Sequence, residues 1–490
     1  MADHSITPRA TDYSQWYLDV ISAAELSDYS PVKGSMVLRP HGFAVWDLMR
    51  NELDARFRDT GHVNAYFPLL IPMSFLSKEA EHVAGFAKEC AVVTHHRLRA
   101  VAGGEGVEPD PTAKLEEPLI IRPTSETIIW HMYGKWIQSH RDLPILINQW
   151  ANVVRWEMKT RPFLRTAEFL WQEGHTAHAT KAEAEAEAMQ MLRVYEEFAR
   201  TVLALPVIAG AKSASERFAG AVDTLCIEAM MQNGWALQAG TSHFLGQNFA
   251  QAFDVTFTGE SGVREHVWAT SWGVSTRLVG AVIMTHSDDT GLVLPPAIAP
   301  VQVVLTPIWK GDAERAEVVA FAEGVAARLK GLRVKVDTRD QLKPGAKYFE
   351  WERKGVPLRL EIGPRDMAKG AVFAAPRTGG GKFSIPVDDN LLAAVQAQLD
   401  SIQSTLYDRA AERLRERTLP VSSYAELKQR VDAGGFFVVN WCDDAANEAT
   451  IKEETRATIR CYPLDLQTPT GPCFYSGRPA THVAVFARAY

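Results

Sequence analysis

Cysteine is scarce in this chain. The 490 residues include only five cysteines, Cys90, Cys226, Cys442, Cys461 and Cys473. So small and odd a number argues against a framework of disulfide bonds and is typical of a protein from a reducing compartment. We therefore expect a cytoplasmic protein.

Long apolar runs and an excess of positive charge are also missing. No run approaches the roughly 18 residues that a membrane-spanning helix needs, and the start of the chain lacks the basic-then-apolar pattern of a signal peptide. The formal net charge is -7, which argues against a protein that coats nucleic acid but allows a local basic face. These absences predict a protein without a membrane partner.

What is present is the composition of an ordinary globular protein, with 46% hydrophobic and 23% charged residues. A chain of this length suffices for roughly two to four domains. The proline-rich residues 292–300, LVLPPAIAP, mark a domain boundary. Beyond them strand-like and helix-like segments alternate, which predicts a small mixed sheet flanked by helices. A long helical stretch at residues 390–417 then leads into a last small domain.

Residues 148–175, NQWANVVRWEMKTRPFLRTAEFLWQEGH, read as two extended runs joined by a tight polar link at residues 159–162. Side chains alternate between the two faces of a strand. An antiparallel hairpin could therefore gather two sets of side chains on one surface. These are Arg155 and Glu157 from the first run, and Arg165, Phe169, Trp171, Glu173 and His175 from the second.

Such a surface suits a ligand that has both phosphates and a flat base. Two arginines can hold a polyphosphate through paired hydrogen bonds, and an aromatic ring can stack on adenine. The alternative is a solvent-exposed hairpin with ordinary salt bridges. The aromatic residues that interleave with the charges on one face argue against this alternative.

A second polar group follows the apolar run in residues 119–127, LIIRPTSET. The run brings a Thr-Ser-Glu turn to the edge of a sheet, where we expect a helix to begin at Glu126. Thr124 and Glu126 could bind a ligand there. The alternative for Thr124 is a helix-capping role.

Two glycine-containing stretches follow later in the chain. Residues 238–246, QAGTSHFLG, predict a loop that bears Gln238, Thr241 and His243. A lone histidine in such a loop is more often a turn or core residue. In residues 268–280, WATSWGVSTRLVG, Arg277 follows a turn of small residues and lies in the first turn of a helix. The amide dipoles at such a helix start favour anions.

These stretches resemble the class II aminoacyl-tRNA synthetases. Arg155-Trp156-Glu157, followed by RTAEF at residues 165–169, is similar to motif 2 of that class, which we place at about residues 148–175. The flanking RPTSET and FLWQEGH resemble the prolyl-tRNA synthetase family. Residues 61–72 resemble motif 1 and residues 268–280 motif 3.

The resemblance covers essentially the whole chain and implies an α+β protein. It implies a class II antiparallel-sheet catalytic domain at residues 1–292, an α/β anticodon-binding domain at 300–400 and a small C-terminal α/β domain at 401–490. Motif 1 would build a homodimer. The domain order looks like the archaeal and eukaryotic type, which some bacteria also carry, with a C-terminal extension and no editing insert.

The resemblance also implies a reaction. ATP, with Mg²⁺, would activate L-proline to prolyl-adenylate, and the prolyl group would pass to the 3′ end of proline tRNA. The residues that would bind proline are Thr124, Glu126, Arg155, Trp171, His175 and His243. The residues that would bind ATP are Arg155, Glu157, Arg165, Thr166, Phe169, Gln238, Thr241, Ser275 and Arg277. Arg155 and Arg277 would be the catalytic residues.

The same resemblance extends to tRNA recognition. Glu352, Arg359 and Arg365 match anticodon contacts of the family. They lie in residues 341–382, which hold nine Lys or Arg against four Asp or Glu and are thus locally basic. A solvated face is the alternative explanation for this charge. Arginine suits guanine edges because it donates two parallel hydrogen bonds.

The end of the chain departs from the family in one respect. Cys442 and Cys473 match half of a four-cysteine zinc pattern, whose other two positions are Asn447 and Ser476. Amide and hydroxyl oxygens bind zinc poorly, so we expect no zinc. Tyr490, the last residue, would dock on the catalytic domain near the active site. Alternatively it packs only on its own small domain.

Two other functions compete with this interpretation. A non-catalytic relative could have kept the fold, but Glu126, Arg155 and Arg277 are all present. A class II enzyme for threonine or serine would need a pocket that satisfies a side-chain hydroxyl. The RPTSET and GTSH segments favour proline.

Overall fold

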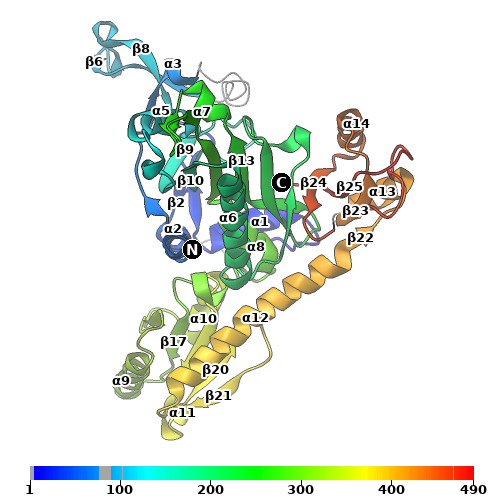
Figure 1. Ribbon diagram of the computed structural model, residues 1–490. Coiled ribbons are helices and arrows are strands. Elements are labelled where there is room, and N and C mark those ends of the chain that lie inside the picture. Colours follow the sequence, from blue (N-terminus) through cyan, green and yellow to red (C-terminus); the bar gives the residue numbers. More distant parts are fainter. Residues whose placement is uncertain (1–4, 77–89, 102, 467) are drawn as a thin grey trace.

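The computed structural model describes residues 5–76, 90–101, 103–466 and 468–490, which are organised around one large sheet (Figure 1). Its eleven strands run in the order β22-β23-β25-β24-β11-β12-β13-β16-β10-β9-β3. Seven of them precede residue 300: β3 (Val63–Asn64), β9 (Ile145–Val154), β10 (Glu168–His178), β11 (Val207–Ala211), β12 (Asp223–Met230), β13 (Ala236–Gly246) and β16 (Trp268–Ser275). Adjacent strands among these pair antiparallel, except that β3 is parallel to β9. The α+β class predicted from the sequence is confirmed.

Helices cover one face of this sheet. They are α1 (Tyr13–Ala23), α2 (Pro40–Asp59), α6 (Lys181–Thr201) and α8 (Arg277–His286). Tyr195 of α6, Phe57 of α2 and Trp272 of β16 are almost fully buried, and their rings lie between 4.9 and 6.4 Å apart. This aromatic packing occupies one face of the sheet and leaves the side chains of the other face available to a ligand.

Several smaller sheets and helices complete this part of the structure. One three-stranded sheet consists of β4 (Leu70–Pro72), β8 (Lys114–Ile121) and β5 (Ala91–His95). Three two-stranded sheets pair β1 (Ser27–Tyr29) with β2 (Met36–Leu38), β6 (Leu98–Ala100) with β7 (Val107–Pro109), and β14 (Thr256–Thr258) with β15 (Arg264–His266). The short helices are α3 (Met73–Leu76), α5 (Glu126–Trp136) and α7 (Asn248–Ala252).

Residues 61–72, which resemble motif 1, contain β3 and β4, and these two strands belong to different sheets. One local prediction for this part is wrong. Residues 238–246 are the central strand β13 rather than a loop. Gly240 there packs closely against Val274 and Tyr195, where a larger side chain would crowd them.

Glu187 of α6 is buried, and its Oε1 lies 2.9 Å from Nε2 of the buried His62. A second local prediction is also wrong. The link between β9 and β10 is not tight, because it comprises the whole of residues 155–167. Only the antiparallel bridge between Arg161 and Arg165 inside it is a tight turn.

A second unit follows the proline-rich residues 292–300. Its sheet has the order β18-β17-β19-β20-β21, and its strands are β17 (Val303–Pro307), β18 (Val334–Val336), β19 (Leu358–Ile362), β20 (Ala371–Pro376) and β21 (Phe383–Pro386). β18 and β19 each pair parallel with β17, whereas β20 pairs antiparallel with β19 and β21 antiparallel with β20. Its helices are α9 (Asp312–Arg328), α10 (Pro344–Arg353) and α11 (Pro364–Ala368). The mixed sheet flanked by helices that the sequence predicted is thus present.

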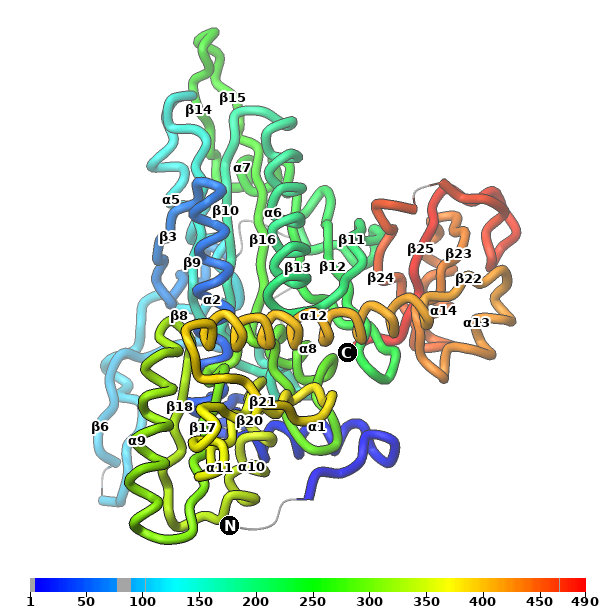
Figure 2. The backbone as a smooth tube through the Cα atoms, turned by 90° about the horizontal axis from the view of Figure 1, so that it is seen from below, coloured from blue at the N-terminus to red at the C-terminus, as the bar shows by residue number. Residues whose placement is uncertain are grey.

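The long helix α12 (Leu391–Arg417) runs from this second unit to the C-terminal unit, as Figure 2 shows. The C-terminal unit contains β22 (Thr418–Pro420), α13 (Tyr424–Arg430), β23 (Phe436–Trp441), α14 (Ala445–Thr455), β24 (Thr458–Pro463) and β25 (His482–Ala487). None of the helices in the described ranges has an apolar stretch long enough to cross a membrane.

The C-terminal unit is not separate from the large sheet. β24 pairs antiparallel with β11 through Gly210 opposite Pro463 and Ala211 opposite Tyr462. A Cβ atom at Gly210 would lie 2.6 Å from both Cβ of Cys461 and the carbonyl oxygen of Tyr462, so the close approach of the two strands requires glycine. The result is one continuous sheet that joins the two ends of the chain.

A buried charge cluster reinforces this junction. Glu228 of β12 is fully buried and accepts hydrogen bonds from Nζ of Lys212 at 2.7 Å and from the guanidinium of Arg460 at 3.1 Å. Lys212 also donates to the carbonyl oxygen of Arg460 at 2.7 Å. Burial alone would raise the pKa of Glu228, but the two cations lower it, so the carboxylate stays charged between the strands.

Candidate active site

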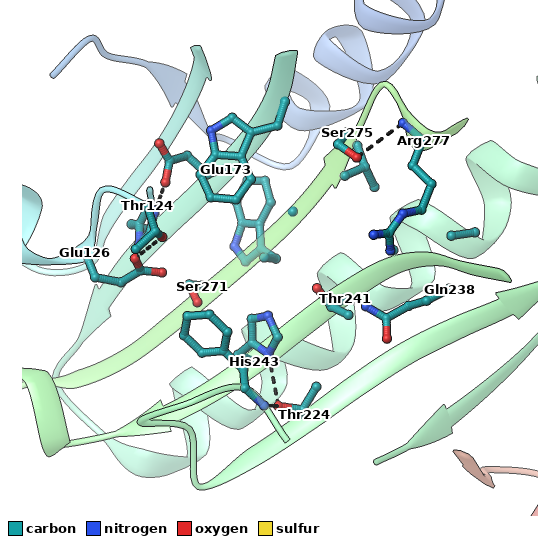
Figure 3. A pocket seen from close by; sticks show the side chains of 18 of the residues that line it. Thr124, Glu126, Glu173, Thr224, Gln238, Thr241, His243, Ser271, Ser275 and Arg277 are labelled. Carbon is teal, nitrogen blue, oxygen red and sulfur yellow. Dashed lines mark hydrogen bonds and ion pairs between the residues drawn. The ribbon is translucent and has the colours of Figure 1, made fainter. Parts of the chain in front are cut away.

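A cavity of about 250 Å³ lies on the face of the large sheet that the helices leave uncovered (Figure 3). Strands β10, β13 and β16 form its floor, and the turn before α5 and residues 216–218 form its walls. The predicted site residues that line it are Thr124, Glu126, Arg155, Phe169, Trp171, His175, Gln238, Thr241, His243, Ser275 and Arg277. Segments distant in the sequence thus meet at one cavity.

Strand alternation explains why β10 supplies so many of these groups. Trp171, Glu173 and His175 point into the cavity, whereas Gln172 between them accepts a hydrogen bond of 2.6 Å from the hydroxyl of Tyr195 on the opposite face. Gly174 also faces the helices, and a Cβ atom there would lie 2.1 Å from the ring of Trp272. The predicted alternation of the second run is therefore confirmed from Phe169 to His175.

The three predicted residues that do not line the cavity are Glu157, Arg165 and Thr166. β9 ends at Val154, so strand alternation does not continue to Glu157. Arg165 is largely exposed and its Nε lies 3.2 Å from Glu157, while Thr166 donates to the carbonyl oxygen of Glu168 at 2.8 Å. The expectation that both runs share one surface is wrong for Glu157 and Arg165.

Carboxylates dominate one end of the cavity. Thr124 donates through its hydroxyl to Glu126, the first residue of α5. The side chain of Thr124 therefore does not cap the helix, which was the alternative that the sequence left open. Glu173 is buried and accepts hydrogen bonds from Ser125 at 2.5 Å, Gln149 at 2.7 Å and His175 at 3.0 Å.

The Glu173–His175 pair favours its charged form. Burial alone would raise the pKa of Glu173, but its hydrogen bonds, chiefly that from His175, lower it. Burial would lower the pKa of His175, but Glu173 and the nearby charge of Glu126 raise it. The carboxylates of Glu126 and Glu173 at this end suit a cationic group of a ligand.

Three buried polar atoms that line the same end have no hydrogen-bond partner among the described residues. They are Nε1 of Trp171, Nδ1 of His175 and Oγ of Ser271. Buried donors are usually satisfied, so these atoms are suited to a polar ligand held beside Glu126.

His243 lies opposite, and its ring stacks on that of Phe218 with centroids 4.5 Å apart. Its Nδ1 is 3.0 Å from the hydroxyl of Thr224. Burial and the charge of His175 lower the pKa of His243 to about 3, so this histidine is neutral at physiological pH. It contributes an apolar ring face and a hydrogen-bonding atom rather than a charge.

Arginines dominate the other end. The guanidinium of Arg155 lies 5.6 Å from the ring centre of Phe169 and 5.4 Å from that of Trp171, and its Nε donates to the carbonyl oxygen of Pro123 at 3.0 Å. Arg277 is the first residue of α8. Burial and the charges of Arg155 and Arg165 lower its pKa to about 10, but it remains a cation. This concentration of positive charge at a helix start suits a polyphosphate.

Sequence reasoning placed Glu173 on the shared face but gave no role to several other residues that line the cavity, among them Glu216, Thr224 and Ser271. Alternation along β16 could have identified Ser271, because it is opposite His175 on one side and His243 on the other. Glu216 and Thr224 give no such signal, since only the tertiary fold brings them to the cavity.

The predicted anticodon residues lie in the second unit. Arg359 of β19 is buried, and its guanidinium lies 2.8 Å from Glu352, 3.1 Å from Glu361 and 4.1 Å from the ring centre of Tyr348. Arg365 of α11 is exposed. The structure brings Glu352 and Arg359 together, whereas Arg365 lies on a different element, the helix α11.

Tyr490 contacts residues outside the C-terminal unit, in the part of the chain that precedes the proline-rich residues 292–300. Its backbone N–H donates to the carbonyl oxygen of Ala236 at 3.1 Å, and its hydroxyl accepts a hydrogen bond from Nδ2 of Asn233 at 2.7 Å. Its ring is 5.1 Å from that of Trp235 and 5.4 Å from the guanidinium of Arg161. Tyr490 is not among the residues that line the cavity, but Arg161 belongs to the 155–167 link.

The two cysteines of the partial zinc pattern lie near Ser476 and Arg478. Sγ of Cys442 is 3.4 Å from the hydroxyl of Ser476 and 3.4 Å from the guanidinium of Arg478. Arg478 also pairs with Asp444. Within the described ranges no three His, Cys, Asp or Glu side chains are arranged to hold a metal ion.

Comparison with known proteins gives matches over most of the chain. Residues 109–286 match the tRNA synthetase class II core domain (G, H, P, S and T), residues 302–398 an anticodon binding domain, and residues 424–490 the prolyl-tRNA synthetase C-terminal domain. The chain is 57% identical over 487 residues to the proline–tRNA ligase of Porphyromonas gingivalis, covering 99% of both chains. It is 56% identical to those of Bacteroides fragilis, over 491 residues, and Prosthecochloris aestuarii, over 494 residues, again covering 99% of each chain.

The contrasting environments of the two histidines predict distinct titrations. His175 should titrate above its ordinary pKa of 6.5, so its contribution to stability is fully present below that pH and is lost as the pH rises through the raised value. His243, with a pKa of about 3, should not titrate between roughly pH 5 and 8. NMR of the labelled histidine rings, assigned with His175→Gln and His243→Gln variants, measures both. A midpoint for His175 below 6.5 would contradict the ion pair.

Proposed function

Since this chain belongs to the prolyl-tRNA synthetase family of class II, we propose that it activates L-proline with ATP and transfers the prolyl group to proline tRNA. The observation that carries this proposal is the polarity of the cavity. Its acidic end and its arginine-rich end lie on the same sheet face, and aromatic rings stand between them. An amino acid and a nucleoside triphosphate fit such a cavity end to end.

The acidic end suits proline. Its secondary ammonium offers two donors, which Thr124 and Glu126 can accept while Glu173 keeps the surroundings negative. Trp171, His175 and His243 line the remaining walls, and their rings would contact the pyrrolidine ring. Arg155, at the border between the two ends, would hold the carboxylate.

The arginine-rich end suits ATP. We propose that Arg155 also contacts the α-phosphate, that Arg277 holds the outer phosphates, and that Phe169 stacks on adenine. Gln238, Thr241 and Ser275 offer further polar contacts to the nucleotide from β13 and β16. Arg165, Glu157 and Thr166 would complete the nucleotide site from the 155–167 link, Arg165 at the phosphates and Glu157 at the adenine amino group.

Mg²⁺ would enter with ATP. In proteins this ion is commonly held by substrate phosphates and one or two carboxylates, and the described residues show no preformed cluster of ligands. In the first step the proline carboxylate attacks the α-phosphorus, forming prolyl-adenylate and releasing pyrophosphate. Charge builds up on the phosphate oxygens, where Arg155 and Arg277 stabilise it. No side chain needs to act as a nucleophile.

In the second step a ribose hydroxyl at the 3′ end of the tRNA attacks the prolyl carbonyl, and AMP leaves. We propose that the unit at residues 300–400 binds the anticodon through Glu352, Arg359 and Arg365, since residues 302–398 match an anticodon-binding domain. The catalytic domain then comprises residues 1–292 and the C-terminal domain residues 401–490. The last boundary falls inside α12, which both domains share.

We further propose a cytoplasmic homodimer. Motif 1 at residues 61–72 carries exposed apolar side chains, with 62% of Val63 and 71% of Tyr66 accessible. Continuous exposed apolar surface is typical of a protein interface. The few cysteines fit a reducing compartment.

We propose that the chain has no editing insert. The relatives compared above are bacterial and do not support the archaeal and eukaryotic label. What supports the absence of an editing insert is the segment between β10 and β16. It consists of α6, strands of the large sheet, the short helix α7 and the β14–β15 hairpin, without a further domain.

The first test is the exchange of pyrophosphate into ATP with each amino acid. Proline should support it, and Glu126→Ala and Arg155→Ala should each lower kcat/KM roughly 30- to 1000-fold, because losing a charge-assisted contact costs on the order of 2–4 kcal/mol. Glu108→Ala and Arg99→Ala, which break an exposed ion pair on the β6–β7 hairpin, are the matched controls. Exchange within threefold of the parent in the two site variants would show that the site is assigned wrongly.

Tyr490 gives a second test, since we propose that its docking beside Arg161 orders the motif 2 link. Deleting Tyr490 should lower proline activation roughly tenfold with little change in the unfolding temperature. Tyr490→Phe keeps the ring contacts and loses only the hydrogen bond from Asn233, so it should be milder. A lowered unfolding temperature with unchanged activation would instead indicate a purely local packing role.

Zinc gives a third test. We propose that the C-terminal domain folds without zinc, because two thiols remain and the guanidinium of Arg478 lies beside Cys442. Elemental analysis of chelator-washed protein should find no bound zinc. The variant Asn447→Cys with Ser476→Cys restores four thiols and should retain zinc under the same wash. About one zinc in the parent chain would refute the proposal.

A further inference from the structure

The C-terminal domain contacts the wall of the cavity directly. Residues 213–218 connect the buried Lys212 to the cavity, and three of them, Glu216, Arg217 and Phe218, line it. One 3-10 turn, Ala214–Glu216, is their regular structure. Because no sheet ladder fixes this segment, hereafter the wall segment, side-chain contacts must set its position.

Three of those contacts come from one helix of the C-terminal domain, α14. Glu448 of this helix is 5% exposed and accepts hydrogen bonds from the hydroxyls of Ser213, at 2.9 Å, and Ser215, at 2.5 Å. One turn further along, Nζ of Lys452 lies 3.2 Å from Oε1 of Glu216. The hydroxyl of Ser213 would otherwise be placed to cap the 3-10 turn, but it donates to Glu448 instead.

The other end of the wall segment touches the proposed proline site. The backbone N–H of Phe218 donates to the hydroxyl of Thr224 at 3.2 Å, and the same hydroxyl lies 3.0 Å from Nδ1 of His243. The ring of Phe218 stacks on the ring of His243. A shift of the wall segment would therefore change both Phe218 and the orientation of His243.

A buried carboxylate is a costly way to hold two serines, because its charge must be taken out of water. An apolar side chain would fill the same space at lower cost but would not fix the direction of two hydroxyls. The arrangement therefore favours positional precision in the wall segment over stability of the interface.

We propose that Glu448 is a positioning residue for the amino acid. By holding Ser213 and Ser215 it fixes the wall segment, and through Phe218 and His243 it sets the shape of the proline end of the cavity. The proposal rests on the proposed function, which identifies that end with proline. Glu448 itself touches neither substrate.

Steady-state pyrophosphate exchange separates this role from a structural one. In Glu448→Ala the KM for proline should rise roughly tenfold, while kcat and the KM for ATP stay within about twofold. Glu448→Gln keeps the size of the side chain and can still bond both hydroxyls, so it should recover most of the proline affinity. The double variant Ser213→Ala with Ser215→Ala should match Glu448→Ala, and combining all three changes should add nothing more.

The control is Glu454→Gln on the same helix. Glu454 pairs with Lys428 and Tyr424 inside the C-terminal domain, and its contacts do not involve the wall segment. It should leave all three kinetic constants and the unfolding temperature unchanged.

Two outcomes would overturn the proposal. One is an unchanged KM for proline in Glu448→Ala. The other is a parallel change of kcat, both KM values and the unfolding temperature in Glu448→Ala, Glu448→Gln and the serine double variant alike. That result would indicate a merely structural contact. The parent chain alone tests the proposed function. Absence of proline-dependent pyrophosphate exchange in it would refute that function, whatever the variants show.

Discussion

The two faces of β10 impose the main constraint on this structure. One face carries Gln172 and Gly174 into the aromatic packing of α6 and Trp272, and the other carries Trp171, Glu173 and His175 into the cavity. Because the side-chain period of a strand is two, a register shift of one residue would exchange the faces. Such a shift would bring a residue with a side chain to the position of Gly174. Its Cβ atom would then overlap the ring of Trp272, so the shift is blocked. Core packing thus holds the site in register.

The cavity separates charge along a single sheet face. Glu126 and Glu173 lie at one end, Arg155 and Arg277 at the other, and the aromatic rings of Phe169 and Trp171 flank Arg155 between them. Nε of Arg155 donates to the carbonyl oxygen of Pro123, and Nε of Arg277 donates to that of Leu164. Fixed, opposed charges of this kind need little reorganisation when a ligand with opposite polarity binds.

Sequence patterns identified about half of the residues that line the cavity, because these residues follow local rules. Alternation placed Trp171 and His175 correctly, and a small-residue turn placed Arg277 at a helix start. Patterns failed where tertiary contacts decide. Gly240 and its neighbours looked like a loop but form a central strand, because small residues permit close packing there. The pair of Glu187 and His62 joins residues that are distant in the sequence, so no local pattern predicts it. Nothing near Glu448 indicated a link to the cavity wall.

The pairing of β24 with β11 has a consequence for synthesis on the ribosome. The edge of β11 is exposed when residues 207–211 emerge, and its partner, residues 458–463, follows roughly 250 residues later. At ~5–20 residues per second the nascent chain presents an unpaired strand edge for roughly 12 to 50 seconds. Unpaired edges are sites of wrong association. β11 is short and contains Gly210 and alanines, so a strand from another chain would gain little binding energy by pairing with it. The late completion of the sheet therefore carries a limited risk of wrong association.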